Sequence, residues 1–289
     1  MSLTIRIART TSDLEALFRA RHRVFVDEEL YLARREGGRI YDRFDAYPTT
    51  ANFIALIGGR VVGAVRYVTP SAAGTPADDF YDFAELISQW NAQAGSGSML
   101  FVEKESRSLR GVARALVRVG LTWSAIHGTT HVLAVVNPIA EHIFVRTGHE
   151  RAAPPFFDEE HKVGVLPMVL RMASSRESLH REVLAASLSD RIDHVVAHVL
   201  APEERAPVGE LGGWTILVAA GQVLARGREG EMEAWSSGAV RDIDDGFSNG
   251  RELVAQGEET MLLCFPPVER ATSSLRSTAR RASGVESRP

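Results

Sequence analysis

Residues 101–117, Phe101-Val-Glu-Lys-Glu-Ser-Arg-Ser-Leu-Arg-Gly-Val-Ala-Arg-Ala-Leu-Val117, join an apolar run to a helical pattern through a polar turn. The apolar run predicts a strand over Met99–Glu103, and the spacing of the apolar residues that follow predicts a helix over Leu109–His127. Small residues at Gly111 and Ala113 leave room for a ligand beside the backbone, and the amides of a helix start attract anions. The junction predicts a site for a pyrophosphate or phosphopantetheine group, with a purely structural corner as the alternative.

The segments around this junction extend an α/β pattern. Further strands are expected at Ile5–Ala8, Ala51–Ile57, Val61–Val68, His131–Val136 and Val163–Met172. Further helices are expected at Asp13–Asp27, Phe80–Trp90 and Asn137–Thr147, with a turn at Gly95-Ser-Gly97. Gly58-Gly59 between two β-rich runs is a hairpin signal. The order predicts a mixed sheet with crossover helices, an α/β (α+β) domain over residues 1–172.

The pattern changes after residue 172. Residues 173–200 predict a linker helix, with its helical stretch at Glu177–Val199. Residues 201–270 carry short β-type runs bounded by glycines: Trp214–Ala219, Gly221–Arg226, Met232–Trp235, Ala239–Ile243, Leu253–Ala255 and Met261–Phe265. They predict a small all-β roll or barrel, and the Ser/Arg-rich residues 271–289 predict a disordered tail.

Composition bounds the class of protein. The 289 residues favour two domains, and 45% hydrophobic with 24% charged residues is ordinary for a soluble globular chain. A net charge of -4 gives no global sign of nucleic-acid binding, and one cysteine, Cys264, excludes an internal disulfide or a Cys-based zinc cluster. The histidines lack ligand spacing, so no metal is expected. Without a signal-peptide pattern or a run near 18 apolar residues, we expect a cytoplasmic protein with no membrane span.

The junction at residues 108–113 resembles the acyl-donor motif of the GNAT acyltransferase superfamily, Gln/Arg-x-x-Gly-x-Gly/Ala. The glycine and the small final residue match, while Ser108 replaces the leading Gln or Arg. The resemblance implies an acyl-CoA or acyl-carrier-protein donor. It implies that the donor contacts Phe101, Val102, Ser108, Arg110, Gly111, Val112, Ala113 and Arg114.

A second motif of the superfamily is similar to residues 136–149, where Asn137, Ala140 and Gly148 match. Phe144 stands where many members carry a tyrosine thought to protonate the leaving thiolate. Either that acid is dispensable in this chain or another group, such as His142, supplies the proton.

The N-terminal part resembles acyl-homoserine-lactone synthases and long-chain N-acyl amino acid synthases. The matching stretches are Arg21-His-Arg-Val-Phe25, Asp42-Arg-Phe-Asp45 and Gly63-Ala-Val-Arg66. The resemblance implies that Arg21, Phe25, Asp42 and Asp45 shape the acceptor site together with Arg66. The Glu-x-Ser-Arg of lactone synthases is absent, since the chain reads Gly95-Ser-Gly-Ser-Met99, which argues against a homoserine lactone product.

Acyl transfer to an amine needs a proton acceptor and a donor to the oxyanion. Glu103 and Glu105 alternate along the predicted strand, so a carboxylate there could accept the amine proton, directly or through water. Backbone amides at Phe101–Glu103 would polarise the thioester carbonyl. Glu103, Arg66 and Asn137 are the predicted catalytic residues; structural ion pairs are the alternative for the charged ones.

Arg107, Arg110, Arg114 and Arg118 are spaced to share one face of the turn and helix. Such a stripe would clamp phosphates or dock an acidic acyl-carrier protein, unless it is only a solvated helix face.

The leading hypothesis is therefore an N-acyltransferase that moves an acyl group from acyl-carrier protein or acyl-CoA onto a small amine such as an amino acid. A homodimer is compatible with the sequence. The alternative is a non-catalytic protein of the same fold that senses a ligand or binds a partner through residues 201–270, a region faintly similar to the β-roll of cyclic-nucleotide-binding and cupin-like domains. An empty opening between the strands at Phe101 and Val135, lined by Glu103, would favour the enzyme, and a filled opening would rule the enzyme out.

Overall fold

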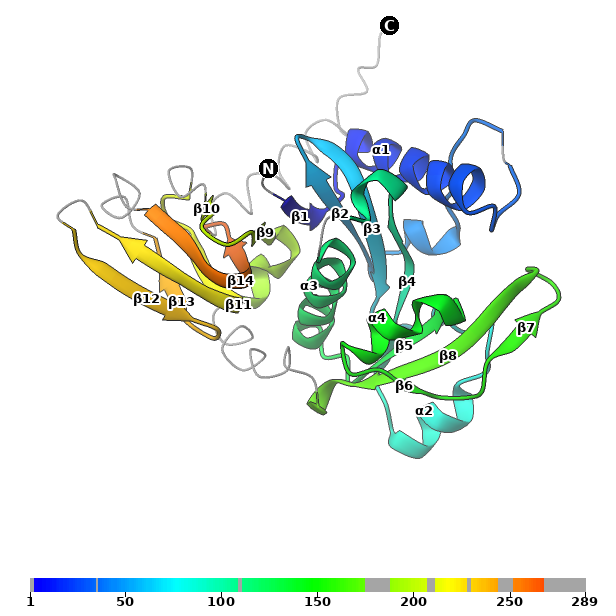
Figure 1. Ribbon diagram of the computed structural model, residues 1–289. Helices are drawn as coiled ribbons and strands as arrows, with labels where there is room; N and C mark the ends of the chain where they lie inside the picture. Colours follow the sequence, from blue (N-terminus) through cyan, green and yellow to red (C-terminus); the bar gives the residue numbers. More distant parts are fainter. Residues whose placement is uncertain are drawn as a thin grey trace, which may run out of the picture. The chain divides into compact units, whose positions relative to one another are not determined.

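The computed structural model describes residues 3–34, 36–108, 111–174, 188–206, 211–227, 230–243 and 252–267. The chain forms two compact units, residues 1–186 and 187–289 (Figure 1). No helix in these described ranges is long and apolar enough to cross a membrane.

The first unit is one mixed sheet with helices on both faces. Its strands are β1 (Leu3–Ile7), β2 (Thr50–Ile57), β3 (Arg60–Val68), β4 (Ala94–Val102), β5 (His131–Val136), β6 (Glu150–Arg151), β7 (Phe156–Asp158) and β8 (Val163–Arg171). Its helices are α1 (Thr11–His22), α2 (Ala84–Trp90), α3 (Val112–Ile126) and α4 (Glu141–Val145). The sheet order is β1-β2-β3-β4-β5-β8-β6, with β7 paired to β8. Among the strand pairs described within this unit, β4 and β5 alone are parallel, and α3 connects them. The predicted α/β class is confirmed.

Alternation along β2 and β3 decides which helix covers which face. Phe53 and Tyr67 point toward α3, where Phe53 packs on Trp123 and the Tyr67 hydroxyl donates to Val117 O at 3.2 Å. Ile54 and Ala64 point the other way, into a cluster with the apolar residues of α1. Figure 1 shows α3 lying against the central strands, as a crossover helix must between parallel neighbours.

Glycines inside β4 make room for Tyr67. The predicted turn at Gly95–Gly97 is wrong, because both glycines lie within β4. A Cβ atom on Gly97 would lie 3.3 Å from the Tyr67 ring, and one on Gly95 would lie 2.6 Å from Val68 O. The glycines therefore mark close packing rather than a chain reversal.

Several other boundaries differ from the prediction. The helix expected over Asp13–Asp27 ends at His22 and continues as a π-helical turn, Arg23–Glu28. The expected linker helix is wrong at its end, where β9 (Val196–Leu200) is a strand, because its β-branched run favours extended backbone. The 175–187 part of that linker and the 271–289 tail lie outside the described residues.

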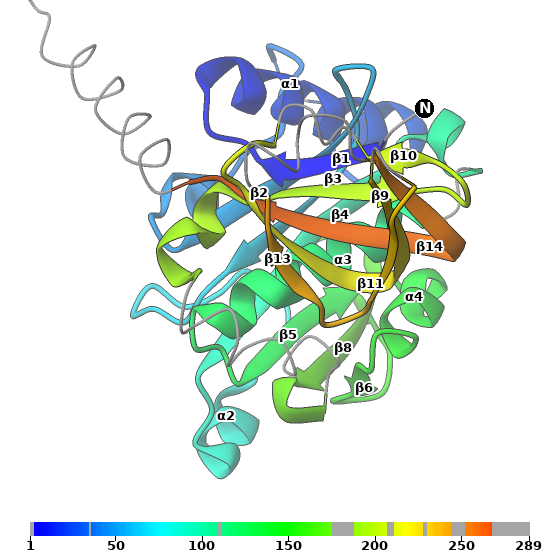
Figure 2. The same ribbon diagram turned by 90° about the vertical axis from the view of Figure 1, so that its left-hand side faces the viewer.

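The second unit consists of antiparallel strands around one core. They are β9, β10 (Arg205–Ala206), β11 (Thr215–Arg226), β12 (Met232–Ser236), β13 (Val240–Asp242) and β14 (Glu252–Phe265). The long strands β11 and β14 run side by side (Figure 2), and each joins two runs that the sequence predicts as separate strands. Their pairing slips between Val218 and Gln222, so the glycine at 221 accompanies a bulge and not a turn.

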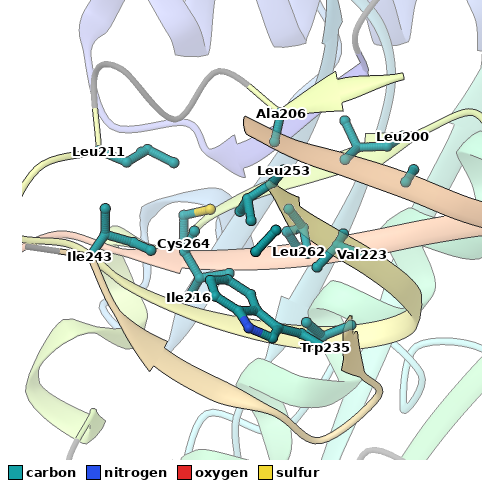
Figure 3. Close-up of a cluster of buried hydrophobic side chains, with 13 residues drawn as sticks. Leu200, Ala206, Leu211, Ile216, Val223, Trp235, Ile243, Leu253, Leu262 and Cys264 are labelled. Atoms are coloured by element: carbon teal, nitrogen blue, oxygen red, sulfur yellow. The ribbon is translucent and has the colours of Figure 1, made fainter. Parts of the chain in front are cut away.

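The core of the second unit is apolar. The side chains of Ile216, Trp235, Leu262 and Cys264 converge in it (Figure 3). Burial raises the pKa of the Cys264 thiol to about 12, so this cysteine is a buried apolar residue without nucleophilic character at neutral pH. The extra strands form an additional β domain, and its likeness to a nucleotide-binding or cupin-type roll stays a prediction.

Gly120 of α3 provides a test of the packing around Tyr67. A Cβ atom at this position would overlap the Tyr67 ring. We expect Gly120→Ala to lower the free energy of unfolding by about 1–3 kcal/mol, as overpacked cores do, although alanine is the better helix former. Urea denaturation followed by circular dichroism measures the change.

Gly164→Ala is the matched control, because its added methyl would meet nothing nearer than Pro138 Cδ at 3.5 Å. Its effect should stay within about 1 kcal/mol. Equal stability of Gly120→Ala and wild type would contradict the packing described here.

Candidate active site

Strand β4 leaves its parallel neighbour half-way along. The pairing of β4 with β5 runs from Ala94 to Gly97 and stops, although β4 continues to Val102. Beyond this point β5 pairs with β8 alone among the described strands. The cause is a bulge in β4, where two residues, Met99 and Leu100, oppose the single Val65 of β3, and Met99 adopts a positive φ of 52°. The separation places the open edge of β4 next to the end of β5.

Val102 presents its backbone to this open side. The Glu103 amide donates to Val62 O at 2.9 Å, so Glu103 faces β3 and Val102 faces away from it by the alternation of an antiparallel ladder. The Val102 carbonyl accepts from Arg107 Nε at 3.0 Å on that side. Of the amides predicted to polarise a carbonyl, Glu103 N is therefore occupied, and Val102 N–H points to the open edge.

Helix α3 begins beside the end of β4. Gly111 caps the helix at a φ of 94°, a conformation that favours glycine, and Val112 and Ala113 form its first turn. Their amides are among the four that a helix start leaves without helical partners. Ser108 is exposed in the preceding turn and Arg114 follows in the helix, whereas Arg110 lies outside the described residues.

The predicted arginine stripe is interrupted. Arg107 donates from Nη2 to Glu29 Oε1 at 2.6 Å and to Glu28 Oε2 at 3.3 Å. It ties the segment after α1 to the end of β4, so it acts as a structural link rather than as a member of an open phosphate clamp.

Four of the predicted acceptor-site residues form one buried ion network on the α1 face of the sheet. Arg21 donates to both oxygens of Asp45 at 2.9 and 2.8 Å. Arg66 donates to Asp42 Oδ1 at 2.5 Å, and its Nη1 lies 3.4 Å from Asp45 Oδ2. Phe25 lies apart from the charges, edge-on against Phe101 with ring centroids 5.7 Å apart.

Two neutral partners of this network were missed by the sequence analysis. Asn52 accepts from Arg21 Nη2 at 2.6 Å, and Ser98 accepts from Arg66 Nε at 3.0 Å. Asn52, Arg66 and Ser98 are direct cross-strand neighbours on β2, β3 and β4. Each of these three adjacent strands carries a polar residue at this level. That pattern would have indicated the network, but it becomes visible only when the strand register is known.

Burial and charge act in opposite directions on Asp45. Its side chain is 4% exposed and that of Arg21 is fully buried. Burial alone would raise the pKa of Asp45, but the nearby Arg21 and Arg66 guanidiniums outweigh it and the pKa is lowered. Asp45 is therefore a permanent counter-ion, whereas Asp42 has 33% of its side chain exposed and can meet a ligand.

Glu103 does not line an empty opening. Its carboxylate is buried, with Arg23 Nη2 at 2.5 Å from Oε1 and Arg60 Nη1 at 3.1 Å from Oε2. Glu105 was expected to share its strand face, but it lies in a 3-10 turn after β4 and is exposed. The two strands do separate, yet the Glu103 side chain, which was to line an opening between them, turns toward two arginines.

Asn137 directly follows β5, and its amide meets a residue that the sequence analysis missed. Asn137 Nδ2 donates to Tyr31 Oη at 3.4 Å, and Asn137 Oδ1 accepts from the Ile139 amide at 3.0 Å. His142 points Nδ1 to Ile139 O at 3.0 Å, and Phe144 is buried in an apolar cluster. Tyr31 lies in a loop with no sequence motif of its own, which is why the pattern gave no sign of it.

Removal of the Asp45 charge tests the network. We expect Asp45→Asn to lower the free energy of unfolding by about 3–5 kcal/mol, because it leaves Arg21 buried without its counter-ion. Asp79→Asn removes an exposed partner of Arg43 and should cost at most about 1 kcal/mol. Chemical denaturation at pH 7 compares the two, and equal effects would contradict a buried network.

The same pair predicts a pH dependence. Because the folded pKa of Asp45 is lowered, its stabilisation is present above the unfolded value of about 4 and is lost as the pH falls through the folded value. The free energy of unfolding of wild type should therefore fall more than that of Asp45→Asn between about pH 5 and pH 3, a range that includes the pKa of an unfolded aspartate. Parallel losses would contradict the assignment.

Comparisons with known proteins identify the family and the fold. The family model described as N-acyl amino acid synthase FeeM matches residues 16–171, just over half of the chain. The structure of FeeM, an N-acyl amino acid synthase from uncultured soil microbes, aligns with a TM-score of 0.50 at 14% identity, over 63% of this chain and 98% of that one.

Two further structures show lower scores. BjaI, a CoA-dependent acyl-homoserine lactone synthase, has a TM-score of 0.45 at 21% identity, over 66% of this chain and 90% of its own. ElaA of Escherichia coli has a TM-score of 0.45 at 14% identity, over 59% and 100%. A search of curated proteins finds no match. The first unit thus has the GNAT fold of an acyltransferase, and the chain belongs to the FeeM family of N-acyl amino acid synthases.

Proposed function

We propose that this N-acyltransferase moves an acyl group from a phosphopantetheine thioester, carried by coenzyme A or an acyl-carrier protein, to the amine of an amino acid. The separation of β4 from β5 beside the start of α3 carries the proposal, because it combines a backbone donor with an anion site. A thioester needs a donor at its carbonyl oxygen, and a phosphopantetheine needs a place for its phosphate.

The donor would enter along the open edge of β4. Its phosphate would meet the amides of Gly111, Val112 and Ala113, which the helix dipole makes attractive to an anion. Its thioester carbonyl would accept from Val102 N–H, which points to the open side of the strand. An amide fixed in a sheet is already oriented for the oxyanion that forms during attack, so it needs no reorganisation.

The acceptor would lie on the α1 face, where the ion network has one accessible carboxylate. Asp42 can hold the ammonium of the acceptor, while the buried Arg66, Asp45 and Arg21 keep this carboxylate in place from the inside. Glu103 keeps lone pairs beyond those used by Arg23 and Arg60, and in this proposal it accepts the amine proton through a water molecule. Asn137 orients Tyr31, whose phenol oxygen accepts a hydrogen bond from the Asn137 side-chain amide at the end of β5.

The direct test is product formation by the purified full-length chain. We expect it to convert a mixture of the twenty amino acids with long-chain acyl-coenzyme A, or with acyl-carrier protein, into N-acyl amino acids. Mass spectrometry identifies the acyl chain and the acceptor. Transfer from only one of the two donors would define the natural carrier, and no amide product from either would overturn the proposal in favour of a ligand-binding role.

A charge placed at the helix start tests the phosphate site without harming the fold. Ala113→Asp adds a carboxylate in the first turn of α3, which suits the helix dipole but repels a phosphate. We expect its KM for the donor to rise at least about 10-fold, the equivalent of about 1.4 kcal/mol, with no loss of melting temperature.

Ala113→Asn is the matched control, since it adds the same bulk without the charge, and its KM should rise much less than that of Ala113→Asp. If the Asp and Asn variants bind the donor equally well, the phosphate lies elsewhere.

A further inference from the structure

The leaving thiolate of the donor must gain a proton, and the second motif of this chain does not provide the acid. Phe144 has no ionisable group, and its ring packs edge-on against His149. Burial lowers the pKa of His149 to about 4, so this histidine is neutral at physiological pH and has no acidic proton to give readily. His142, in the same motif, directs Nδ1 to Ile139 O at 3.0 Å, and a carbonyl oxygen only accepts, so the proton of its neutral ring is held by the backbone. A proton donor from another element is therefore the better candidate.

Tyr31 contacts the start of the second motif, at Asn137, from a segment that follows α1. It ends the segment 23–31, which crosses from α1 over the ends of β4 and β5. Glu28 accepts from the Lys104 amide at 3.0 Å just beyond β4, and Tyr31 Oη accepts from Asn137 just beyond β5 at 3.4 Å. The backbone of this segment is fixed by the Tyr31 amide, which donates to Phe25 O at 2.8 Å. The phenol is thereby held where the two strands separate.

We propose that Tyr31 is the catalytic acid of this enzyme, which protonates the sulfur of the leaving phosphopantetheine thiolate. The inference rests on the proposed function and adds a catalytic residue to it. The amine nitrogen forms a bond to the thioester carbon, and the carbon–sulfur bond breaks. The electron pair of that bond goes to sulfur, which takes the proton from Tyr31 Oη. The phenolate then regains a proton released by the attacking ammonium, so the net products are an amide, a thiol and one proton.

The surroundings of Tyr31 keep its phenol protonated at neutral pH. Partial burial and then the charge of Glu29 raise the pKa of the phenol, against a smaller opposite effect of Arg107. A raised pKa makes the phenol a weaker acid, so the proposed role depends on the position of Tyr31 and not on its acidity. Its side chain is still 38% exposed, so a substrate can reach it. Asn137 Nδ2 donates to the phenol oxygen, and the phenol hydroxyl also hydrogen-bonds to the Glu29 carboxylate, so the phenol hydrogen must leave Glu29 when it passes to sulfur.

The basicity of the leaving thiol provides the test. An alkyl thiolate such as that of pantetheine needs a proton, whereas 4-nitrothiophenolate is far less basic and can leave without one. We expect Tyr31→Phe to lower kcat with acyl-pantetheine by about 100-fold, the lower range for a general acid, with little change in KM. With the acyl 4-nitrothiophenyl ester, the same variant should remain within about 3-fold of wild type.

Tyr41→Phe is the matched control, since Tyr41 is 55% exposed and packs on Phe18 with ring centroids 5.5 Å apart. It should keep wild-type rates with both esters. Equal losses of Tyr31→Phe on both esters, or no loss on either, would overturn the assignment while wild-type transfer still upholds the proposed function. Absence of transfer by wild type would instead overturn the proposed function itself.

Discussion

Strand β4 cannot pair with β5 along its whole length, and the candidate active site depends on that single constraint. The bulge at Met99 and Leu100 directs β4 away after Gly97, while β3 still holds it on the other side. A methionine at positive φ costs of order 1–3 kcal/mol, and such strain is found where function requires it. The result is an open strand edge beside a helix start, which is the geometry that a thioester with a phosphate tail needs.

The charged residues on the α1 face lie in the interior of the first unit, where burial is tolerable only if each charge has a partner. Arg21 with Asp45 meets this requirement at full burial, and Arg66 links the pair to the exposed Asp42. Segment 23–31 then closes the far end of the gap through Glu28, Arg107 and Tyr31.

Local patterns were sufficient to predict the α/β order, the Gly58-Gly59 hairpin and α3, and the resemblance of the motifs pointed to the N-acyl amino acid synthases. They failed where tertiary packing overrides a local signal. Gly95 and Gly97 resemble a turn but lie in β4 because Tyr67 and Val68 approach closely, and Gly221 accompanies a bulge inside β11. Within the site, Glu103 was predicted as an open base, but Arg23 and Arg60 come from distant segments that no spacing reveals. Tyr31 was missed for the same reason, since its contact with Asn137 spans 106 residues of sequence.

The central claim is that the acyl donor lies where β4 leaves β5. A crystal structure with an unreactive acyl-coenzyme A analogue, in which a ketone replaces the thioester linkage, tests it most directly. The account predicts the ketone oxygen within hydrogen-bond distance of Val102 N, the phosphate at the amides of residues 111–113, and Tyr31 Oη facing the position of sulfur. An analogue bound elsewhere on the chain, with the gap between β4 and β5 closed by side chains, would contradict it.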